Sequence, residues 1–292
     1  MSNRIYIHDL SSYSVGLHNC LTVPLDDLLA NGFKVRQTDI RLANSVNTAM
    51  QLVAVLFQVQ SLHQFGGVAS GHTDHTIVLY VRKSFLKHYL DGLKYIEDAS
   101  PVQLKYYAEK KDRSIESNFY KTNSKAYPYA MDMTEKEVHQ SVEGLYHNLN
   151  SLQSRSGNQL PFSLINFGTC TEPEGRMVTR HLLEVSIEGL GKFHRTSIFP
   201  GSIFQLKKGI NREPGDPNYD LFQLALKSIA QRLYPDYANG DVSMQKDWVL
   251  SDREARQSVI DQLSQEDYSK LLAALERDLK LKDLLMLDVV DE

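Results

Sequence analysis

Apolar residues recur with the period of an α-helix in several long stretches of this chain. The clearest is residues 45–63, where Val46, Met50, Val53 and Phe57 recur at helical spacing. The apolar coverage of this stretch is wide enough to indicate either burial or a subunit contact. Similar patterns predict further helices at residues 74–95, 135–155, 172–188 and 217–233.

Residues that can bind free backbone N–H groups precede three of these helices. They are Thr134 with Glu137, Thr171 with Glu174, and Asp216 with Pro217 at the first helical position, where no N–H is needed.

Short apolar runs between the predicted helices predict β-strands. Residues 160–168 and 196–206 are two such runs, and residues 5–23 resemble a strand-loop-strand entry. Asn31-Gly32 is a turn signal between apolar flanks. From residue 134 onward the order is helix, strand, helix, strand, helix. This order is typical of an α/β fold in which helical crossovers join parallel strands.

Two segments depart from this alternation. Residues 97–133 are rich in Lys, Asp, Ser and Tyr, and we interpret them as a peripheral insertion in a domain that spans residues 1–245. The lysines of this segment alternate with acids and tyrosines, which favours a solvated face over a binding surface. Residues 246–292 are predicted to be helical and amphipathic, as a tail or an insertion.

The composition is that of an ordinary globular protein, with 42% hydrophobic and 23% charged residues. The net charge of −4 gives no reason to expect nucleic-acid binding. We find no run long enough for a transmembrane helix and no cleavable signal sequence, so we expect no membrane partner. The two cysteines fit a reducing cytoplasm and cannot form an all-cysteine zinc site.

Few residues carry a chemical signal on their own. Cys20, beside Asn19, is by residue type more often a small buried side chain than a reactive thiol, and the same holds for Cys170. His72, Asp74 and His75 include two histidines at i and i+3, but no further ligands are evident, so we expect no metal there.

The 168–171 segment offers a different kind of site. Thr169 and Thr171 precede a predicted helix whose N-terminal N–H groups could receive a phosphate. No glycine-rich phosphate-binding motif accompanies them.

Residues 189–220 closely resemble a segment of class III anaerobic ribonucleotide reductases, which are glycyl-radical enzymes. Their sequence is GLGKFHRTSIFPGSIFQLKKGINREPGDPNYD. Six further segments agree in collinear order, so that the resemblance covers roughly residues 5–245. They are Ile7–Leu10 (IHDL), His18–Leu21 (HNCL), Asn44–Val55 (NSVNTAMQLVAV), Gln64–Val68 (QFGGV), Leu160–Thr169 (LPFSLINFGT) and Leu224–Pro235 (LALKSIAQRLYP). The resemblance implies part of a ten-stranded α/β barrel, with three to five of its strands in this chain.

The resemblance also implies an activity and its site residues. The family reduces ribonucleoside triphosphates to deoxyribonucleotides, and a cysteine at the position of Cys20 gives a hydrogen atom to the ribose 2′ carbon. His8 and Asn19 would lie near the substrate or formate pocket, and Gly168 and Thr169 would contact the nucleotide. The implied partners are effector nucleotides, a second subunit that contacts residues 45–63, and a radical-SAM activase that installs the glycyl radical. Formate is the reductant in many members.

Several elements of the family pattern do not occur in these residues. They are the regulatory ATP-cone domain, the cysteine that becomes a thiyl radical, a four-cysteine zinc site and the radical-storing glycine. We therefore expect this chain to be a fragment of the enzyme that is inactive alone. We also expect it to be poorly soluble unless a partner covers its exposed strand edges and apolar surface, and a complementary C-terminal fragment is one such partner. The alternative is a catalytically inactive remnant that only binds nucleotides or dimerises.

Overall fold

The computed structural model describes residues 19–35, 37–109, 113–121, 125–153 and 159–241. All of these residues lie in the first of two compact units, Met1–Ser243. The second unit, Met244–Glu292, lies outside the described residues, and so does nearly all of the predicted strand-loop-strand entry, including His8. The predicted domain boundaries and the helical tail stay predictions.

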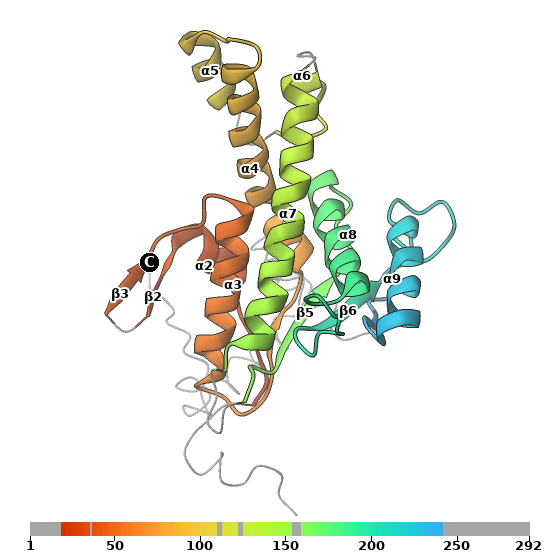
Figure 1. Ribbon diagram of the computed structural model, residues 1–292. Coiled ribbons are helices and arrows are strands. Elements are labelled where there is room, and N and C mark those ends of the chain that lie inside the picture. Colours follow the sequence, from red (N-terminus) through yellow and green to blue (C-terminus); the bar gives the residue numbers. More distant parts are fainter. Residues whose placement is uncertain (1–18, 36, 110–112, 122–124, 154–158, 242–292) are drawn as a thin grey trace, which may run out of the picture. The chain divides into compact units, whose positions relative to one another are not determined.

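The described fold contains a parallel sheet in the order β1-β4-β5-β6-β7. Figure 1 labels β5 and β6 of this sheet. Every connection between neighbouring strands contains at least one helix, as parallel pairing requires. The predicted α/β fold with helical crossovers is therefore confirmed. The strands are β1 (Leu21–Thr22), β4 (Val68–Ser70), β5 (Ser163–Phe167), β6 (Gly201–Leu206) and β7 (Asp236–Asn239). A separate antiparallel hairpin consists of β2 (Phe33–Val35) and β3 (Thr38–Ile40).

Helices α4 and α7 are the longest of the described helices, and they pack along each other (Figure 1). Helix α3 packs on α7, and α8 packs on α4, α7 and α9. The helices are α2 (Leu25–Asn31), α3 (Val46–Ser61), α4 (Thr73–Tyr95), α5 (Pro101–Ala108), α6 (Asn118–Lys121), α7 (Ala126–Ser151), α8 (Pro173–Glu188) and α9 (Tyr219–Arg232). No described helix is both long and apolar enough to cross a membrane.

Helix α3 matches its prediction closely. It begins after Ser45, whose Oγ accepts the backbone N–H of Thr48. Met50 and Phe57 are 1% and 0% exposed, because they pack in the core of this chain. The wide apolar coverage therefore reflects burial at these two positions. A subunit contact through α3 stays a prediction, and it would have to use other residues.

The predicted start of the helix at residues 135–155 was wrong, because α7 begins at Ala126. Thr134 lies inside the helix, where its hydroxyl donates to the carbonyl of Ala130, and Glu137 accepts from Ser84 of α4. Ala126, Ala130 and Thr134 are all buried, so they extend the core-facing side of the helix toward its N-terminus.

Two other predicted caps were also wrong. Helix α8 begins at Pro173 without a side-chain cap, and Glu174 is fully buried, where it pairs with Arg82 of α4 and accepts the N–H of Ile115. Asp216 accepts the N–H groups of Arg212 and Glu213, so it closes the preceding loop instead of capping α9.

Strand β6 is shorter than predicted, since it begins at Gly201 instead of residue 196. In the segment at 97–133, the structure has helices α5 and α6 and the beginning of α7. Ile115 and Tyr120 of this segment are buried, and the Tyr120 ring packs edge-on against Phe85 and Tyr89 of α4. Its interpretation as an insertion stays a prediction.

Candidate functional site

The predicted site residues lie at two different edges of the sheet. Cys20 and Asn19 precede β1, at the amino ends of the strands, whereas Gly168 and Thr169 follow β5, at the carboxyl ends. Strand β5 has five residues, which span about 17 Å. We call the two groups the amino-edge thiol (Cys20 and its contacts) and the carboxyl-edge loop (residues 168–171).

The amino-edge thiol is accessible and has few contacts. Cys20 is exposed, and its Sγ accepts the backbone N–H of Gly67 at 3.2 Å. The thiol also lies 3.5 Å from Oδ1 of Asn19. A Cβ atom on Gly66 would lie 2.5 Å from the backbone nitrogen of Cys20, so a glycine is required where the two segments approach each other.

Asp74 binds the backbone of the carboxyl-edge loop. This carboxylate is fully buried, and its Oδ2 accepts the N–H groups of Gly168 and Cys170, each at 2.9 Å. The hydroxyl of Thr179 on α8 lies 3.4 Å from the same oxygen. A buried carboxylate that accepts backbone N–H groups compensates for the loss of its hydration.

Two buried asparagines hold the carbonyl groups of the same loop. The Nδ2 of Asn211 donates to the carbonyl of Gly168 at 2.8 Å, and the Nδ2 of Asn218 donates to the carbonyl of Cys170 at 2.8 Å. Gly168 has φ +112°, and a Cβ atom there would lie 2.9 Å from the ring of Phe204. The loop conformation therefore requires glycine at this position.

These bonds do not involve the first N–H groups of α8, so phosphate binding at the start of that helix stays a prediction. The N–H groups of Gly168 and Cys170 are already used by Asp74. Burial, followed by the nearby Asp74 charge, raises the pKa of the Cys170 thiol to about 12. A Cβ atom on Gly175 would lie 2.3 Å from the Cys170 sulfur. Cys170 is therefore a protonated packing residue at the helix entry, as its residue type indicates.

Thr171 is the exposed side chain of the loop, and the side chain that contacts α4 is Thr169. It is partly exposed, and its hydroxyl lies 3.1 Å from Nε2 of His75. The neighbouring His72 pairs with Asp26 of α2 at 2.9 Å, while Asp74 binds the loop. The three residues of the HTDH sequence therefore have three different sets of partners.

The His72–Asp26 pair shifts the titration of both groups. The hydrogen bond to Asp26 raises the pKa of His72, and this effect exceeds that of burial, which lowers it. Burial alone would raise the pKa of Asp26, but hydrogen bonds from His72 and Thr76 outweigh it and lower the pKa. Each partner thus favours the charged form of the other.

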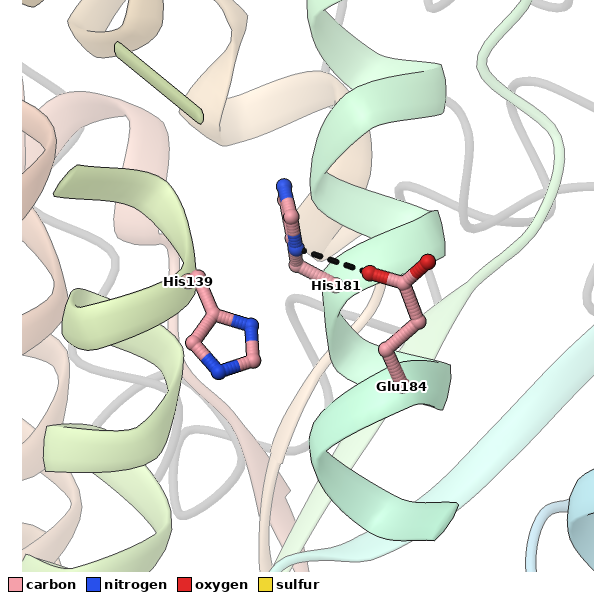
Figure 2. A group of neighbouring side chains, drawn as sticks. All are labelled: His139, His181 and Glu184. Carbon is pink, nitrogen blue, oxygen red and sulfur yellow. Dashed lines mark ion pairs between the residues drawn. The ribbon is translucent and has the colours of Figure 1, made fainter. Parts of the chain in front are cut away.

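Sequence reasoning missed several residues that build these sites. The roles of Asp26, Asn211 and Asn218 depend on residues far away in the chain, so no local pattern marks them. A second missed group is His139, His181 and Glu184, whose ligand atoms all lie within 4.8 Å of one another (Figure 2). Its one local signal is the i, i+3 spacing of His181 and Glu184.

An α/β domain with this fold also occurs in a solved ribonucleotide reductase. The described chain is similar to the crystal structure of the anaerobic ribonucleotide reductase from Thermotoga maritima with citrate in the active site, with a TM-score of 0.52 and 15% identity. The similarity covers 81% of this chain and 38% of that one.

The sequence identifies the family. The family model described as "Anaerobic ribonucleoside-triphosphate reductase" matches residues 1–259, and the chain belongs to this family. It is 32% identical over 239 residues to the enzyme of this name from Haemophilus influenzae, and 33% identical over 236 residues to that from Enterobacteria phage T4. These matches cover 82% and 80% of this chain. The chain spans about a third of the length of these relatives, 30% and 34%.

Proposed function

We propose that this chain forms part of the catalytic barrel of an anaerobic ribonucleoside-triphosphate reductase, in which Cys20 donates hydrogen to the substrate. The observation that carries the proposal is the accessible thiol at the edge of the sheet, in a segment that matches the family. Of the two cysteines, Cys20 is exposed and Cys170 is buried. A hydrogen donor must reach the ribose, and Cys20 alone of these two meets that requirement.

The environment of Cys20 suits this role. The N–H of Gly67 donates to the sulfur at 3.2 Å, and the thiol donates weakly to Oδ1 of Asn19 at 3.5 Å. The side chain nevertheless stays exposed to an incoming substrate.

In the proposed reaction, a radical formed elsewhere removes the ribose 3′ hydrogen, and the 2′ hydroxyl leaves as water with the proton of the 3′ hydroxyl. The Cys20 thiol then supplies a hydrogen atom to the 2′ carbon. Formate, our first candidate for the reductant, then gives a hydrogen atom to the sulfur radical and an electron to the 3′ ketone, and it leaves as carbon dioxide. The 3′ carbon finally recovers a hydrogen atom from the group that removed it.

The carboxyl-edge loop is proposed to contact the nucleotide. Its backbone is fixed by Asp74, Asn211 and Asn218, and this rigidity presents the Thr169 hydroxyl beside the imidazole of His75. A hydroxyl and an imidazole can both donate to phosphate or ribose oxygens. Asn19 and His8 are proposed as further substrate contacts near Cys20.

The remaining components of the reaction are also part of the proposal. A radical-SAM activase would install a glycyl radical on a polypeptide segment other than residues 1–292. That radical would start the reaction. Nucleotide effectors are supported by one structural neighbour with a TM-score of 0.50, which is described as the Thermotoga maritima enzyme in complex with dATP and CTP. A dimer contact through α3 would use its half-buried positions Leu52, Val55 and Val59, because Met50 and Phe57 lie in the core.

The test is Cys20→Ala in the chain combined with a complementary polypeptide that carries the glycyl-radical segment, under anoxic conditions with the activase. Deoxyribonucleotide formation should be abolished while nucleotide binding is kept, since the missing thiol acts on the chemical step. Cys170→Ala is the matched control, and it should retain activity because Cys170 is buried away from substrate.

Two results would contradict the proposal. Equal activity of Cys20→Ala and the unmodified chain would show that Cys20 is not the donor. If the unmodified chain binds nucleotides but yields no product with any complementary polypeptide, the alternative of a nucleotide-binding or dimerisation module would replace it.

A further inference from the structure

Three side chains with metal-binding atoms converge between two packed helices. His139 comes from α7, and His181 and Glu184 come from one face of α8 (Figure 2). The rings of His139 and His181 lie edge to face, with centroids 5.4 Å apart. Because α7 and α8 belong to the packed core, this convergence is fixed by the fold and not by a surface loop.

His181 is the unusual member of the group. The residue is 5% exposed, and neither ring nitrogen has a hydrogen-bond partner among the described residues. Nδ1 lies 3.0 Å from Oε2 of Glu184, but the geometry of this contact does not make a hydrogen bond. Burial, together with the charges of Arg180 and His139, lowers the pKa of His181 to about 4, so the ring is neutral at pH 7.

A neutral imidazole buried without partners is costly, since an unsatisfied polar group loses roughly 1–3 kcal/mol. A ring nitrogen without a hydrogen-bond partner, 3.0 Å from a carboxylate oxygen, is an arrangement that can bind a metal ion. The cost would be offset if an ion were bound between His181 and the carboxylate beside it. This is the feature that distinguishes the group from an ordinary surface cluster of His and Glu.

We propose that His139, His181 and Glu184 form a binding site for a zinc-like divalent transition-metal ion. Two imidazoles and one carboxylate are a ligand set that suits Zn²⁺, whereas Mg²⁺ and Ca²⁺ prefer oxygen ligands alone. Tetrahedral ligands around zinc lie roughly 3.4 Å apart, whereas the present ligand atoms lie within 4.8 Å of one another, so the most distant of them must approach by up to roughly 1.4 Å. His139 and Glu184 can move, because their side chains are 32% and 35% exposed.

Two carboxylates, those of Glu184 and Glu188, and one guanidinium, that of Arg180, lie around the group. Arg180, the nearest fixed positive charge on α8, is paired with Glu135 at 2.9 Å. Glu188 lies one turn beyond Glu184, and its Oε2 is 3.4 Å from Nε2 of His139. Glu188 can therefore orient the His139 ring or complete the coordination, as outer carboxylates do at zinc sites. The ion would cross-link α7 and α8.

The experiment uses the full 292-residue chain after treatment with a chelator. Zn²⁺ is titrated in competition with a chromogenic chelator, and Co²⁺ is used in a parallel titration because its absorption spectrum reports the ligand type. The variants are His139→Ala and Glu184→Gln, which change partly exposed side chains and keep the buried His181 in place. His147→Ala is the control, since His147 also lies on α7 and faces a glutamate, Glu143, at 3.6 Å.

We expect one tight Zn²⁺ site whose affinity falls in both variants by more than about 100-fold, since loss of an outer partner alone costs roughly 10–100-fold. His147→Ala should bind like the unmodified chain. Zn²⁺ should also raise the unfolding midpoint of the unmodified chain but not that of the two variants, because the ion stabilises only the state that binds it. The Co²⁺ spectrum should lack thiolate charge-transfer bands, which excludes Cys20 and Cys170 as ligands.

The proposal is overturned if the unmodified chain has no tight site, or if both variants bind Zn²⁺ as tightly as it does. Thiolate bands in the Co²⁺ spectrum would also overturn it by placing the ion at a cysteine. Circular dichroism of each variant checks the fold, and His181→Gln provides a third variant if either of the first two loses helical signal.

Discussion

The carboxyl-edge loop and the amino-edge thiol are built in opposite ways. In residues 168–170, Asp74 accepts two N–H groups, and Asn211 and Asn218 donate to two carbonyls. The side chains of Asp74, Asn211 and Asn218 are all buried. Cys20 is exposed and has a single backbone donor, Gly67, with Asn19 beside it. One region is fixed by many contacts, whereas the other is accessible and lightly held.

The difference fits a division of labour in the proposed reductase. A loop that contacts a nucleotide benefits from a fixed backbone, because no ordering cost is then incurred when the substrate binds. A thiol that exchanges a hydrogen atom must remain open to the substrate. Stability and proposed activity should therefore respond differently at the two edges, and the following substitutions measure that difference.

Asp74→Ala should have the largest effect on stability. It removes the acceptor of two buried backbone N–H groups and of the Thr179 hydroxyl, and nothing in the substituted side chain replaces it. Leaving these donors unsatisfied should cost about 3–5 kcal/mol of unfolding free energy. Urea unfolding followed by circular dichroism measures the change.

Asp91→Ala is the control for this experiment. Asp91 is on the same helix, α4, and is only partly buried, so its loss should change the unfolding free energy by less than about 0.5 kcal/mol. Similar small losses for both variants would show that Asp74 does not hold the loop.

Much of this fold is predictable from local sequence patterns. The long helices α3 and α4 follow from apolar periodicity, and the alternation after residue 134 predicts the parallel sheet. Two of the wrongly predicted helix caps include a residue that matches a local capping pattern but binds a partner far away in the sequence. Thr134 and Glu137 resemble a capping box, yet Glu137 binds Ser84 and His88 of α4. A local motif cannot indicate that such partners exist.

The sites are less predictable than the fold for the same reason. Cys20 and Gly168 are evident from the family resemblance, but the residues that hold them lie far away in the sequence. Asn218 binds a loop that is 48 residues earlier, and Gly67 binds Cys20 across 47 residues. His139 and His181 meet only because α7 and α8 pack together. Tertiary packing creates these groups, so the sequence alone does not show them.

Gly168→Ala should have an intermediate effect. The backbone there has φ +112°, and the new Cβ atom would lie 2.9 Å from the Phe204 ring, so both strain and a clash oppose it. We expect a loss of about 2–3 kcal/mol. Gly144→Ala is the matched control, because Gly144 is in α7 with no atom within 4 Å of the added Cβ. That change should stabilise the chain by about 0.5–1 kcal/mol. The unfolding midpoints of the two variants measure these changes. Similar midpoints for both would contradict the conclusion that the loop requires glycine at position 168.

Cys20→Ser should have the smallest effect on stability of the three. The side chain is exposed, so the substitution neither opens a cavity nor buries an unpaired group, and the serine oxygen can accept the Gly67 N–H in place of the sulfur. The unfolding free energy should change by less than about 0.5 kcal/mol. A loss near that of Asp74→Ala would show that the amino edge is held as firmly as the carboxyl edge. An unchanged free energy would mean that any loss of activity in Cys20 variants is a loss of chemistry, because the fold around the thiol is intact.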